Sequence, residues 1–453
     1  MSTRLRTLLA LLLATGNAGA LSLQQAYDAA LLHDPAYRMN HFENESAKEN
    51  RVLGRAALLP NISASFSGSK NNADQEVVQG SISFPSHPHY TSRSSAITLR
   101  QPLLNLEAIT RYRQGQVQTE QAAAQFQADA AQLVLRVVGA YVDVLFADDQ
   151  VALARVQRDM YAEQQRVNQR LFEKGEGTRT DMLETRARLD LAEAQLIEAD
   201  DNALALRDAL ESVIGMPAGT LDRLADGAGP GPLTPASFDA WRTIALEHND
   251  ALAAGRLAVE NARLDIARAR AGHMPRIDLV ASYSRGDAES LSTYNQNSVN
   301  RNVGVQLNVP LFAGGAVNAA TRQAVAAHER AKAQFEAQTN AVTLELRKAH
   351  SVVLSSVKKI DALGKAVESS QMLMKATEQS IKGGVRINLD LLNAQQQLYA
   401  ARRDLAQARY AYLLGTLRLK ATAGTLERED IRAVNAWFTP RRPRGGGDPY
   451  CAR

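Results

Sequence analysis

The chain contains an internal duplication, and this repeat limits the folds that are open to it. Residues 55–62 (RAALLPNI) match residues 270–277 (RAGHMPRI) at an offset of 215. Further along, QPLL at 101–104 matches VPLF at 309–312 at an offset of 208. A third match, residues 174–183 with residues 382–392 at an offset of about 209, continues the pattern. A nearly constant offset over such a distance indicates two copies of one structural unit of about 210 residues, which is far longer than a solenoid repeat.

The duplication defines the domain organisation that we expect. The first repeat covers residues 21–215 and the second covers 238–424, with a linker or equatorial region at 216–237 between them. An equatorial segment at 425–438 and a disordered tail at 439–453 follow, because the tail is rich in proline, glycine and arginine. Each repeat should contain a helix, two strands, a long helix, a glycine turn and a shorter returning helix.

Alternation of apolar and polar residues predicts two strands in each repeat. In the second repeat, for example, Val303, Val305 and Leu307 alternate with polar residues or glycine. The polar faces carry mainly Ser, Asn and Gln, which suits a water-filled lumen, and a run of about ten residues is what a tilted strand of a membrane barrel requires. For the strands alone, a soluble sandwich with one solvated face is the alternative. The expected strands are 60–68, 94–103, 275–285 and 300–312, with polar loops at about 68–92 and 285–299.

Two proline-free stretches predict very long helices. No proline occurs between Pro102 and Pro217 or between Pro310 and Pro440, and both stretches are rich in good helix formers. The long helix of the second repeat, at 316–382, would span about 100 Å.

Glycines interrupt each of these helical stretches once. Gly175 and Gly177 mark a turn at 175–177 in the first stretch, and Gly383 and Gly384 mark the turn of the second. The returning helix after each turn and the helix that enters each repeat are both about 50 Å long, so that the two stacked end to end would match one long helix. The entering helices are expected at 22–57 and 238–271.

The returning helices carry heptad repeats. Sustained seven-residue spacing predicts coiled-coil packing. A second seam lies three residues after the first, and its small residues, such as Thr185, Ala192 and Ala199, allow close approach of neighbouring helices. A cytoskeletal or scaffold coiled coil is the alternative, but it does not explain the amphipathic strands. The repeats consist of Met182, Leu189, Leu196, Ala203 and Leu210, and of Leu391, Leu398, Leu405, Tyr412 and Leu419.

The N-terminus predicts a secreted protein. Arg4 and Arg6 precede an apolar run at 8–14, and the A-x-A pattern at 18–20 is typical of a cleavage site, so residues 1–20 read as a signal peptide. We find no further stretch of about 20 apolar residues, so that a membrane crossing would have to use a closed β-barrel. Four strands cannot close a barrel, since the smallest have eight; the barrel must therefore be shared in a cyclic homo-oligomer.

Composition excludes several classes of function. The formal net charge is +4, but arginines of the signal peptide and the tail account for it and leave a nearly neutral body, which argues against nucleic-acid binding. The single cysteine, Cys451, allows no disulfide framework and no cysteine-based metal site, and its role is not evident from the sequence. Without a phosphate-binding glycine loop, a metal-spaced histidine cluster or a nucleophile elbow, we expect no enzyme, no cofactor and no metal.

One segment carries a family resemblance. GVRINLDLLNA at 384–394, followed by LY at 398–399, ARYAYL at 408–413 and AGTL at 423–426, resembles the second tunnel-entrance turn and returning helix of the TolC family of outer-membrane channels. The resemblance covers residues 21 to about 437. It implies a mixed α/β membrane protein, a trimer whose twelve-stranded barrel takes four strands per chain and continues into a long periplasmic α-helical coiled-coil barrel.

The resemblance also implies partners and a function. A periplasmic adaptor (membrane fusion) protein, an inner-membrane ABC transporter or other pump, a secreted protein cargo and the lipid of the cell outer membrane are the expected partners. The Ala- and Arg-rich run between Tyr399 and Tyr410 is similar to members dedicated to protease or toxin secretion. No cysteine follows the cleavage site, where many drug-efflux members are lipidated. A type I protein secretion duct is therefore expected, with small-molecule or drug efflux as the alternative.

The resemblance places the periplasmic tunnel entrance at the glycine turns. Asp181 stands where the family has an aspartate in the first turn, Arg386 at the arginine of the second turn and Asp390 at its first aspartate. Asn393 replaces a second aspartate and Ile381 a latching tyrosine, which implies a weaker acidic ring and a latch held by other residues. Alternatively, Asp181 and Asp390 are charges that complement helix dipoles, and the two interpretations are compatible.

Overall fold

The computed structural model describes residues 20–80, 82–87, 89–225, 231, 233–288, 296–383 and 388–439. The chain divides into two compact units: unit 1 comprises residues 1–42, 126–250 and 339–453, and unit 2 comprises 43–125 and 251–338. The long helices α4 (Leu106–Glu173) and α8 (Ala316–Lys382) contribute to both. Residues 1–19 of the expected signal peptide and residues 440–453 of the expected tail lie outside the described residues.

Each half of the chain contains the same succession of elements, and corresponding helices have equal or nearly equal lengths. The short entering helices have 11 residues each, the next helices 22 each, the long helices 68 and 67, and the returning helices 36 each. The first half runs through α2 (Leu23–His33), α3 (Pro35–Ala56), β1 (Asn61–Asn72), β4 (His89–Leu104), α4 and α5 (Arg179–Ile214). The second runs through α6 (Phe238–His248), α7 (Asp250–Ala271), β6 (Arg276–Ala288), β7 (Gln296–Asn308), α8 and α9 (Asn388–Ala423).

The expectation of a single entering helix in each half was wrong, because the chain forms two successive helices there in both halves. Asp34 ends α2 with ψ 116°, and Pro35, which has no amide donor, begins α3. The Asp34 carboxylate accepts hydrogen bonds from Ala36 N (3.4 Å) and Tyr37 N (3.3 Å), and it also pairs with Arg136 of α4. In the second half, the break falls at Asn249, whose Nδ2 donates to Thr422 O at 2.8 Å.

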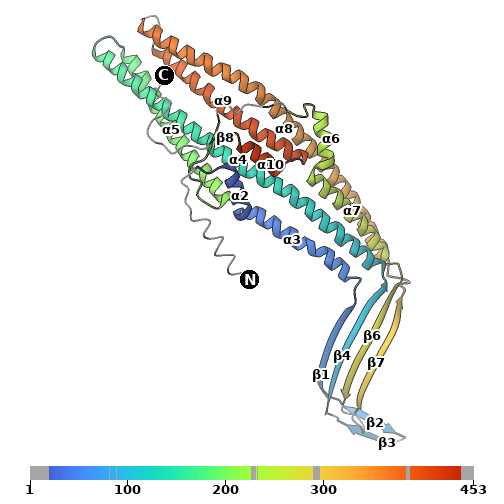
Figure 1. Ribbon diagram of the computed structural model, residues 1–453. Coiled ribbons are helices and arrows are strands. Elements are labelled where there is room, and N and C mark those ends of the chain that lie inside the picture. The colour runs from blue at the N-terminus through green and yellow to red at the C-terminus, as the bar shows by residue number, and fades with distance from the viewer. Residues whose placement is uncertain are drawn as a thin grey trace, which may run out of the picture. The chain divides into compact units, whose positions relative to one another are not determined.

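Unit 2 is built on an antiparallel sheet in the order β1-β4-β6-β7, whose strands lie side by side in Figure 1. The expected strands 60–68 and 94–103 were too short: Gly68 pairs with Arg93, and the ladder continues to Asn72 and His89. The side chains beyond residue 68 are polar on both faces, so that apolar–polar alternation does not reveal where the strand ends. The backbone hydrogen bonds of the ladder continue because they do not depend on this alternation. The expected loop at 68–92 also contains a hairpin of β2 (Gln75–Gln79) and β3 (Ile82–Ser86).

The second strand pair also differs from its expected bounds. β6 reaches Ala288 and β7 spans Gln296–Asn308, so that the expected loop at 285–299 is shorter and the expected strand 300–312 is shifted towards the N-terminus. Pro310 follows the end of β7 and has no amide to donate to a ladder.

The helices of unit 2 pack closely against one another. In α4, a Cβ atom added to Gly115 would lie 2.3 Å from Asn50 O of α3, so that only glycine fits there. Thr119 Oγ1 donates to Ala47 O of α3 at 3.1 Å, one turn further along α4. In the second half, Gln338 Nε2 of α8 donates to Ala251 O of α7 at 3.0 Å.

Unit 1 has an apolar core formed by α2, α4, α5, α9 and α10 (Arg428–Asn435). Leu23, Tyr141 and Leu210 are fully buried in it. The Tyr141 hydroxyl donates to Leu21 O (2.8 Å) and accepts from Asp222 N (3.0 Å). A second cluster surrounds Trp241 on α6. The Tyr141 hydroxyl in this core thus connects Leu21, which precedes α2, with Asp222, which follows α5.

The segment expected as a linker at 216–237 and the C-terminal segment form a small sheet together. β5 (Arg223–Leu224) pairs with β8 (Phe438–Thr439), with Arg223 opposite Thr439. Residue 439 was expected to begin the disordered tail, which was wrong by one position, because its backbone continues this ladder.

One helix in the described part of the chain, α4, contains a segment that is long and apolar enough to cross a membrane, by length and composition alone. The sequence expectation of no such stretch after residue 20 was therefore wrong for α4. Half of that segment is buried. Leu133, Val137, Val138 and Leu145 of the same helix belong to the core of unit 1, so that burial explains the apolar composition.

Candidate functional site

The first glycine turn joins α4 to α5 and is held by the backbone. Gly175 has φ 76°, a left-handed conformation that favours glycine, and its N–H donates to Phe172 O at 3.0 Å. Gly177 N donates to Leu171 O at 3.1 Å, and a Cβ atom on Gly177 would lie 3.0 Å from Phe172 N. These two glycines therefore permit a tight reversal of the chain.

The second turn is only partly described. Gly383 N donates to Gln379 O at 3.1 Å and closes the end of α8. Gly384 and Arg386 lie outside the described residues, and α9 begins again at Asn388. The expected bonding of Arg386 to a neighbouring helix is thus a prediction only.

Asp181 lies in the first turn of α5 and closes a capping box with Thr178. The Thr178 hydroxyl donates to Asp181 Oδ2 at 2.6 Å, and Asp181 N donates to Thr178 Oγ1 at 3.1 Å. This geometry agrees with the interpretation of Asp181 as a residue that stabilises the end of a helix, which is compatible with its interpretation as an aspartate of the tunnel entrance. Its carboxylate is partly exposed.

Asp390 and Asn393 lie at the start of α9. Asp390 is in the first helical turn and is partly buried, whereas Asn393, three residues on, is exposed. The carboxylate at 390 therefore adds negative charge at the positive end of the α9 dipole. The side chain at 393 contributes no charge.

A polar cluster with a buried centre joins α4, α5 and α9 beside the two turns, and sequence reasoning missed it. Thr185 of α5 is fully buried; its Oγ1 accepts from Asn168 Nδ2 of α4 (2.7 Å) and from Asn388 Nδ2 of α9 (3.1 Å). Gln164 Nε2 of α4 donates to Asn388 Oδ1 at 2.7 Å and to Asn168 Oδ1 at 3.2 Å. We refer to Gln164, Asn168, Thr185 and Asn388 as the polar cluster.

The cluster had a signal in the sequence. Thr185 occupies the second heptad seam of α5, in line with Ala192 and Ala199, where a core-facing position is otherwise filled by small apolar residues. A hydroxyl at such a position needs a partner, because burying it without one costs free energy. The identity of that partner, Asn388, could not be derived from spacing.

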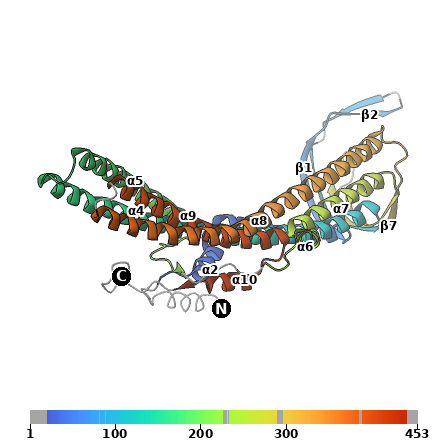
Figure 2. The ribbon, with the colours of Figure 1, turned by 90° about the horizontal axis from the view of Figure 1, so that it is seen from above.

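Further along α9, an apolar layer and a second polar contact continue the attachment, where α4, α5 and α9 run side by side (Figure 2). Tyr161, Leu189, Ala192 and Leu392 pack together and are buried. Gln396 Oε1 of α9 then accepts from Gln157 Nε2 (3.1 Å) and from the Tyr161 hydroxyl (3.3 Å). Helix α9 is thus bonded to the α4–α5 hairpin at two levels.

Another α4–α9 contact lies nearer the core of unit 1. The Tyr410 hydroxyl of α9 donates to Asp149 Oδ2 of α4 at 2.8 Å. Burial, and next the neighbouring Asp149 charge, raise the pKa of Tyr410 well above its ordinary value, so that the phenol stays protonated as a hydrogen-bond donor.

Comparison with known proteins places this arrangement in a wider group. The sequence profile of the family described as "Outer membrane efflux protein" matches residues 26–216 and 241–425. The alkaline protease secretion protein AprF of Pseudomonas aeruginosa is 41% identical over 97% of this chain and 93% of its own length. Outer membrane protein TolC of Vibrio cholerae is 28% identical over 92% of this chain and 93% of its own length.

A solved structure shares the fold. The outer membrane channel CmeC of Campylobacter jejuni superposes with a TM-score of 0.77 at 17% identity, over 92% of this chain and 90% of that one. At this identity the likeness concerns the fold alone.

Proposed function

The chain belongs to the outer membrane efflux protein family, and we propose that it forms the exit duct of a type I secretion system for protein cargo. The resemblance to the TolC family is confirmed, and the chain is an outer-membrane channel protein with its helical part in the periplasm rather than an enzyme. The observation that carries the proposal is the 41% identity, over 97% of the chain, to a protein named for alkaline protease secretion.

The proposed assembly is a trimer with a twelve-stranded barrel. Each chain supplies one four-stranded sheet, and β1 and β7 are its edges. Exposed sheet edges invite pairing with another chain, and a membrane barrel leaves none unpaired. One face of the sheet exposes large apolar side chains such as Phe66 and Val303, 73% and 75% exposed in the single chain, which suits contact with lipid.

The tunnel entrance is proposed at the two turns. Asp390 would supply one carboxylate per chain, and Asp181 a second that already caps α5. Arg386 and Asn393 complete the set, with Gly175, Gly177, Gly383 and Gly384 forming the turns. Three carboxylates around a narrow opening would attract cations, because a constriction focuses their field.

The polar cluster is proposed as the latch of the closed entrance. Ile381 stands where the family has a latching tyrosine, so that other groups must hold α9 against the α4–α5 hairpin. Asn388 makes two hydrogen bonds to that hairpin, to the fully buried Thr185 and to Gln164, in a partly buried setting that limits competition from water. Opening that moves α9 would break these bonds first.

Two further components are proposed. A periplasmic adaptor and an inner-membrane ABC transporter would deliver the cargo to the entrance, because an outer-membrane duct has no energy source of its own. Efflux of small molecules through a different pump is the second candidate, favoured by the description of the family itself.

Complementation tests the proposal. The chain would replace AprF in a Pseudomonas aeruginosa strain that lacks it, and extracellular protease activity would be measured beside resistance to a panel of drugs. Restored protease export without a change in drug resistance supports the secretion duct. Restored drug resistance with no protease outside the cell, at equal amounts of channel in the outer membrane, supports efflux instead.

A further inference from the structure

The apolar face of the four-stranded sheet ends in a band of positive charge. Directly paired residues share a face, so the register assigns each side chain. Ile62, Leu99, Ala281 and Val303 form one row of this face, and successive rows lie two residues apart on each strand. Towards one end, the same face carries four cations, which we refer to as the basic band: Lys70, Arg93, Arg285 and Arg301.

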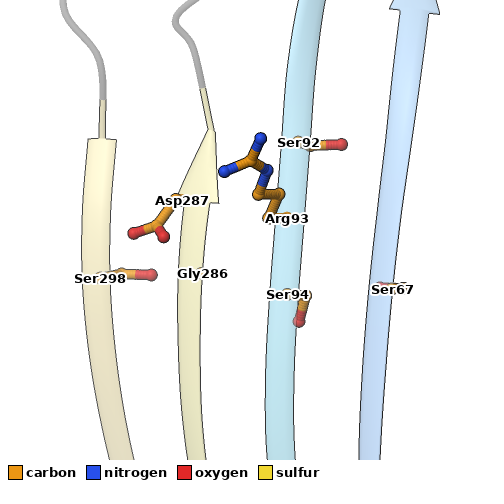
Figure 3. Close-up of a pocket in the computed structure, with 7 residues that line it drawn as sticks. All are labelled: Ser67, Ser92, Arg93, Ser94, Gly286, Asp287 and Ser298. Carbon is orange, nitrogen blue, oxygen red and sulfur yellow. The ribbon is translucent and has the colours of Figure 1, made fainter.

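The opposite face differs in kind. Ser63, Thr98, Ser282 and Asn302 form a matching row there, and further on Ser67, Ser94, Gly286 and Ser298 form another. Because these side chains are small, they leave a shallow pocket on the polar face at the level of Ser67. Ser67, Ser94 and Ser298 are among the residues that line this pocket in Figure 3. At the level of the basic band, the register places the cations on the face that carries the large apolar side chains, whereas Arg100 and Arg276 of the polar face lie nearer the helices.

The apolar rows approach the height of a membrane band. From Leu307 to Val299 on β7 the chain advances eight residues, about 27 Å along the strand, which is about 21 Å of height at a strand tilt of about 40°, compared with an apolar band about 25 Å tall on membrane barrels. Leu307 and Val299 are 61% and 50% exposed. The basic band begins with Arg301 in the row before the last, continues with Arg285 in the last row, and extends past the apolar rows with Arg93 and Lys70.

Connectivity shows which end of the sheet carries the charge. β1 starts at Asn61, just after α3, and β4 leads at Leu104 into α4, so that the helices of unit 2 join one end of the strands. Lys70 and Arg93 lie at the other end. Because the helical part lies in the periplasm, that other end faces the outer leaflet.

The cations exceed the anions on this face. Among the described strand residues there, Asp287 is the one carboxylate, and its Oδ1 lies 3.7 Å from Arg285 Nε. Figure 3 shows the Arg93 guanidinium directed towards β6, while the Asp287 carboxylate on β6 points away from it, towards β7. The Arg301 guanidinium lies 5.7 Å from the centre of the Tyr283 ring, so that an aromatic side chain at the edge of the apolar rows supports it.

We propose that the basic band binds the phosphate groups of an anionic lipid in the outer leaflet. The inference rests on the proposed placement of the sheet in the membrane. Guanidinium groups bind phosphate through two parallel hydrogen bonds, and long arginine side chains keep their stems on apolar surface while the charge reaches the headgroup level. Acyl chains would then cover the apolar rows below.

Lipid binding by the purified protein tests the inference. The assembly in neutral detergent would be titrated with lipid A or with the same lipid after removal of its phosphates, and bound lipid would be counted by native mass spectrometry. The variant R93Q/R285Q/R301Q is compared with R113Q/R276Q/R322Q, which removes three exposed arginines elsewhere in unit 2.

We expect the band variant to bind lipid A at least tenfold more weakly and the control variant to bind it as the original protein does. A variant with lysine at the three positions should recover part of the loss, because the charge is kept and the paired hydrogen bonds are not. Equal binding of the dephosphorylated lipid, or equal loss in both glutamine variants, would overturn the inference while leaving the membrane placement intact. A protein that stays folded and monomeric without detergent and takes up neither lipid would overturn both.

Discussion

Asn388, at the first position of α9, donates through Nδ2 to the fully buried Thr185 hydroxyl of α5 at 3.1 Å, across 203 residues of sequence. Thr185 Oγ1 in turn donates to Asp181 O at 2.8 Å, inside the turn of α5 that Thr178 caps. A contact proposed to hold the entrance is thus continuous with the turn itself.

Thr185→Val removes this hydroxyl at nearly constant volume. Asn168 and Asn388 would each lose an acceptor in a buried place, which we expect to destabilise the closed arrangement by about 1–3 kcal/mol. Single-channel recording should show more frequent open events and a lower midpoint of thermal unfolding. The control is Thr416→Val, whose hydroxyl donates to Tyr412 O within its own helix at 2.9 Å. Equal behaviour of the two variants would rule out a latch at Thr185.

Asp390→Ala is expected to reduce cation selectivity and to weaken block by divalent or trivalent cations added on the periplasmic side. The reason is the loss of one carboxylate per chain at a proposed constriction. Asn393→Ala is the control, since Asn393 is exposed and uncharged. The measurement is reversal potential and blocker titration in planar bilayers. Unchanged selectivity and block in Asp390→Ala would leave only a helix-end role for this carboxylate.

The same substitution at two glycines of α4 should have opposite effects. Gly115→Ala places a Cβ atom 2.3 Å from Asn50 O and should destabilise the protein by about 1–3 kcal/mol through a forced shift of α3. Gly139→Ala meets nothing within 4 Å and should stabilise it by about 0.5–1 kcal/mol, because alanine favours helix. Thermal unfolding in detergent checks both signs. If Gly139→Ala lowered the stability of the protein as much as Gly115→Ala, the packing argument would be contradicted.

Tyr141 should make stability fall in alkaline solution. Burial, and next the Asp222 charge, raise its pKa well above the ordinary 10.0. The folded state therefore holds the phenolic proton more tightly than the unfolded state, so that its contribution is complete below about pH 10 and is lost as the pH rises further. Tyr141→Phe should be less stable at pH 8 through the lost hydrogen bonds, by about 1–2 kcal/mol. The difference in stability between Tyr141→Phe and the original protein should be smaller at pH 11 than at pH 8. An equal difference between their unfolding midpoints at the two pH values would exclude this assignment.

Two truncations separate the tail from the small sheet. Removing residues 440–453, which are rich in proline, glycine and arginine, should leave assembly and the unfolding midpoint unchanged. Removing residues from 438 onwards also deletes Phe438, which is 6% exposed and packs its ring 5.6 Å from that of Tyr141. We expect a clear fall in the midpoint for the longer deletion only, measured on detergent-purified protein. Failure of the shorter one to assemble would assign a structural role to the tail.

Much of the fold was predictable because it follows from local rules. The alternation through Val303, Val305 and Leu307 places these side chains on one face of a strand whatever the strand packs against. The interruption at Gly175 likewise follows from the conformations open to glycine, and Thr178 with Asp181 forms a cap from three-residue spacing alone. The types of the elements and the positions of the turns depend on neighbours within one helical turn or one strand, so the local sequence specifies them.

Tertiary structure decided which distant groups meet. The partner of Thr185 is Asn388, and the reason why Gly115 admits no side chain is Asn50 O, and neither follows from spacing in the sequence. The same holds for Asp34, whose carboxylate caps α3 and pairs with Arg136 to end a helix that periodicity alone would continue. Local patterns state which face of an element is apolar; the rotation and sliding of packed helices determine which atoms lie within hydrogen-bond distance.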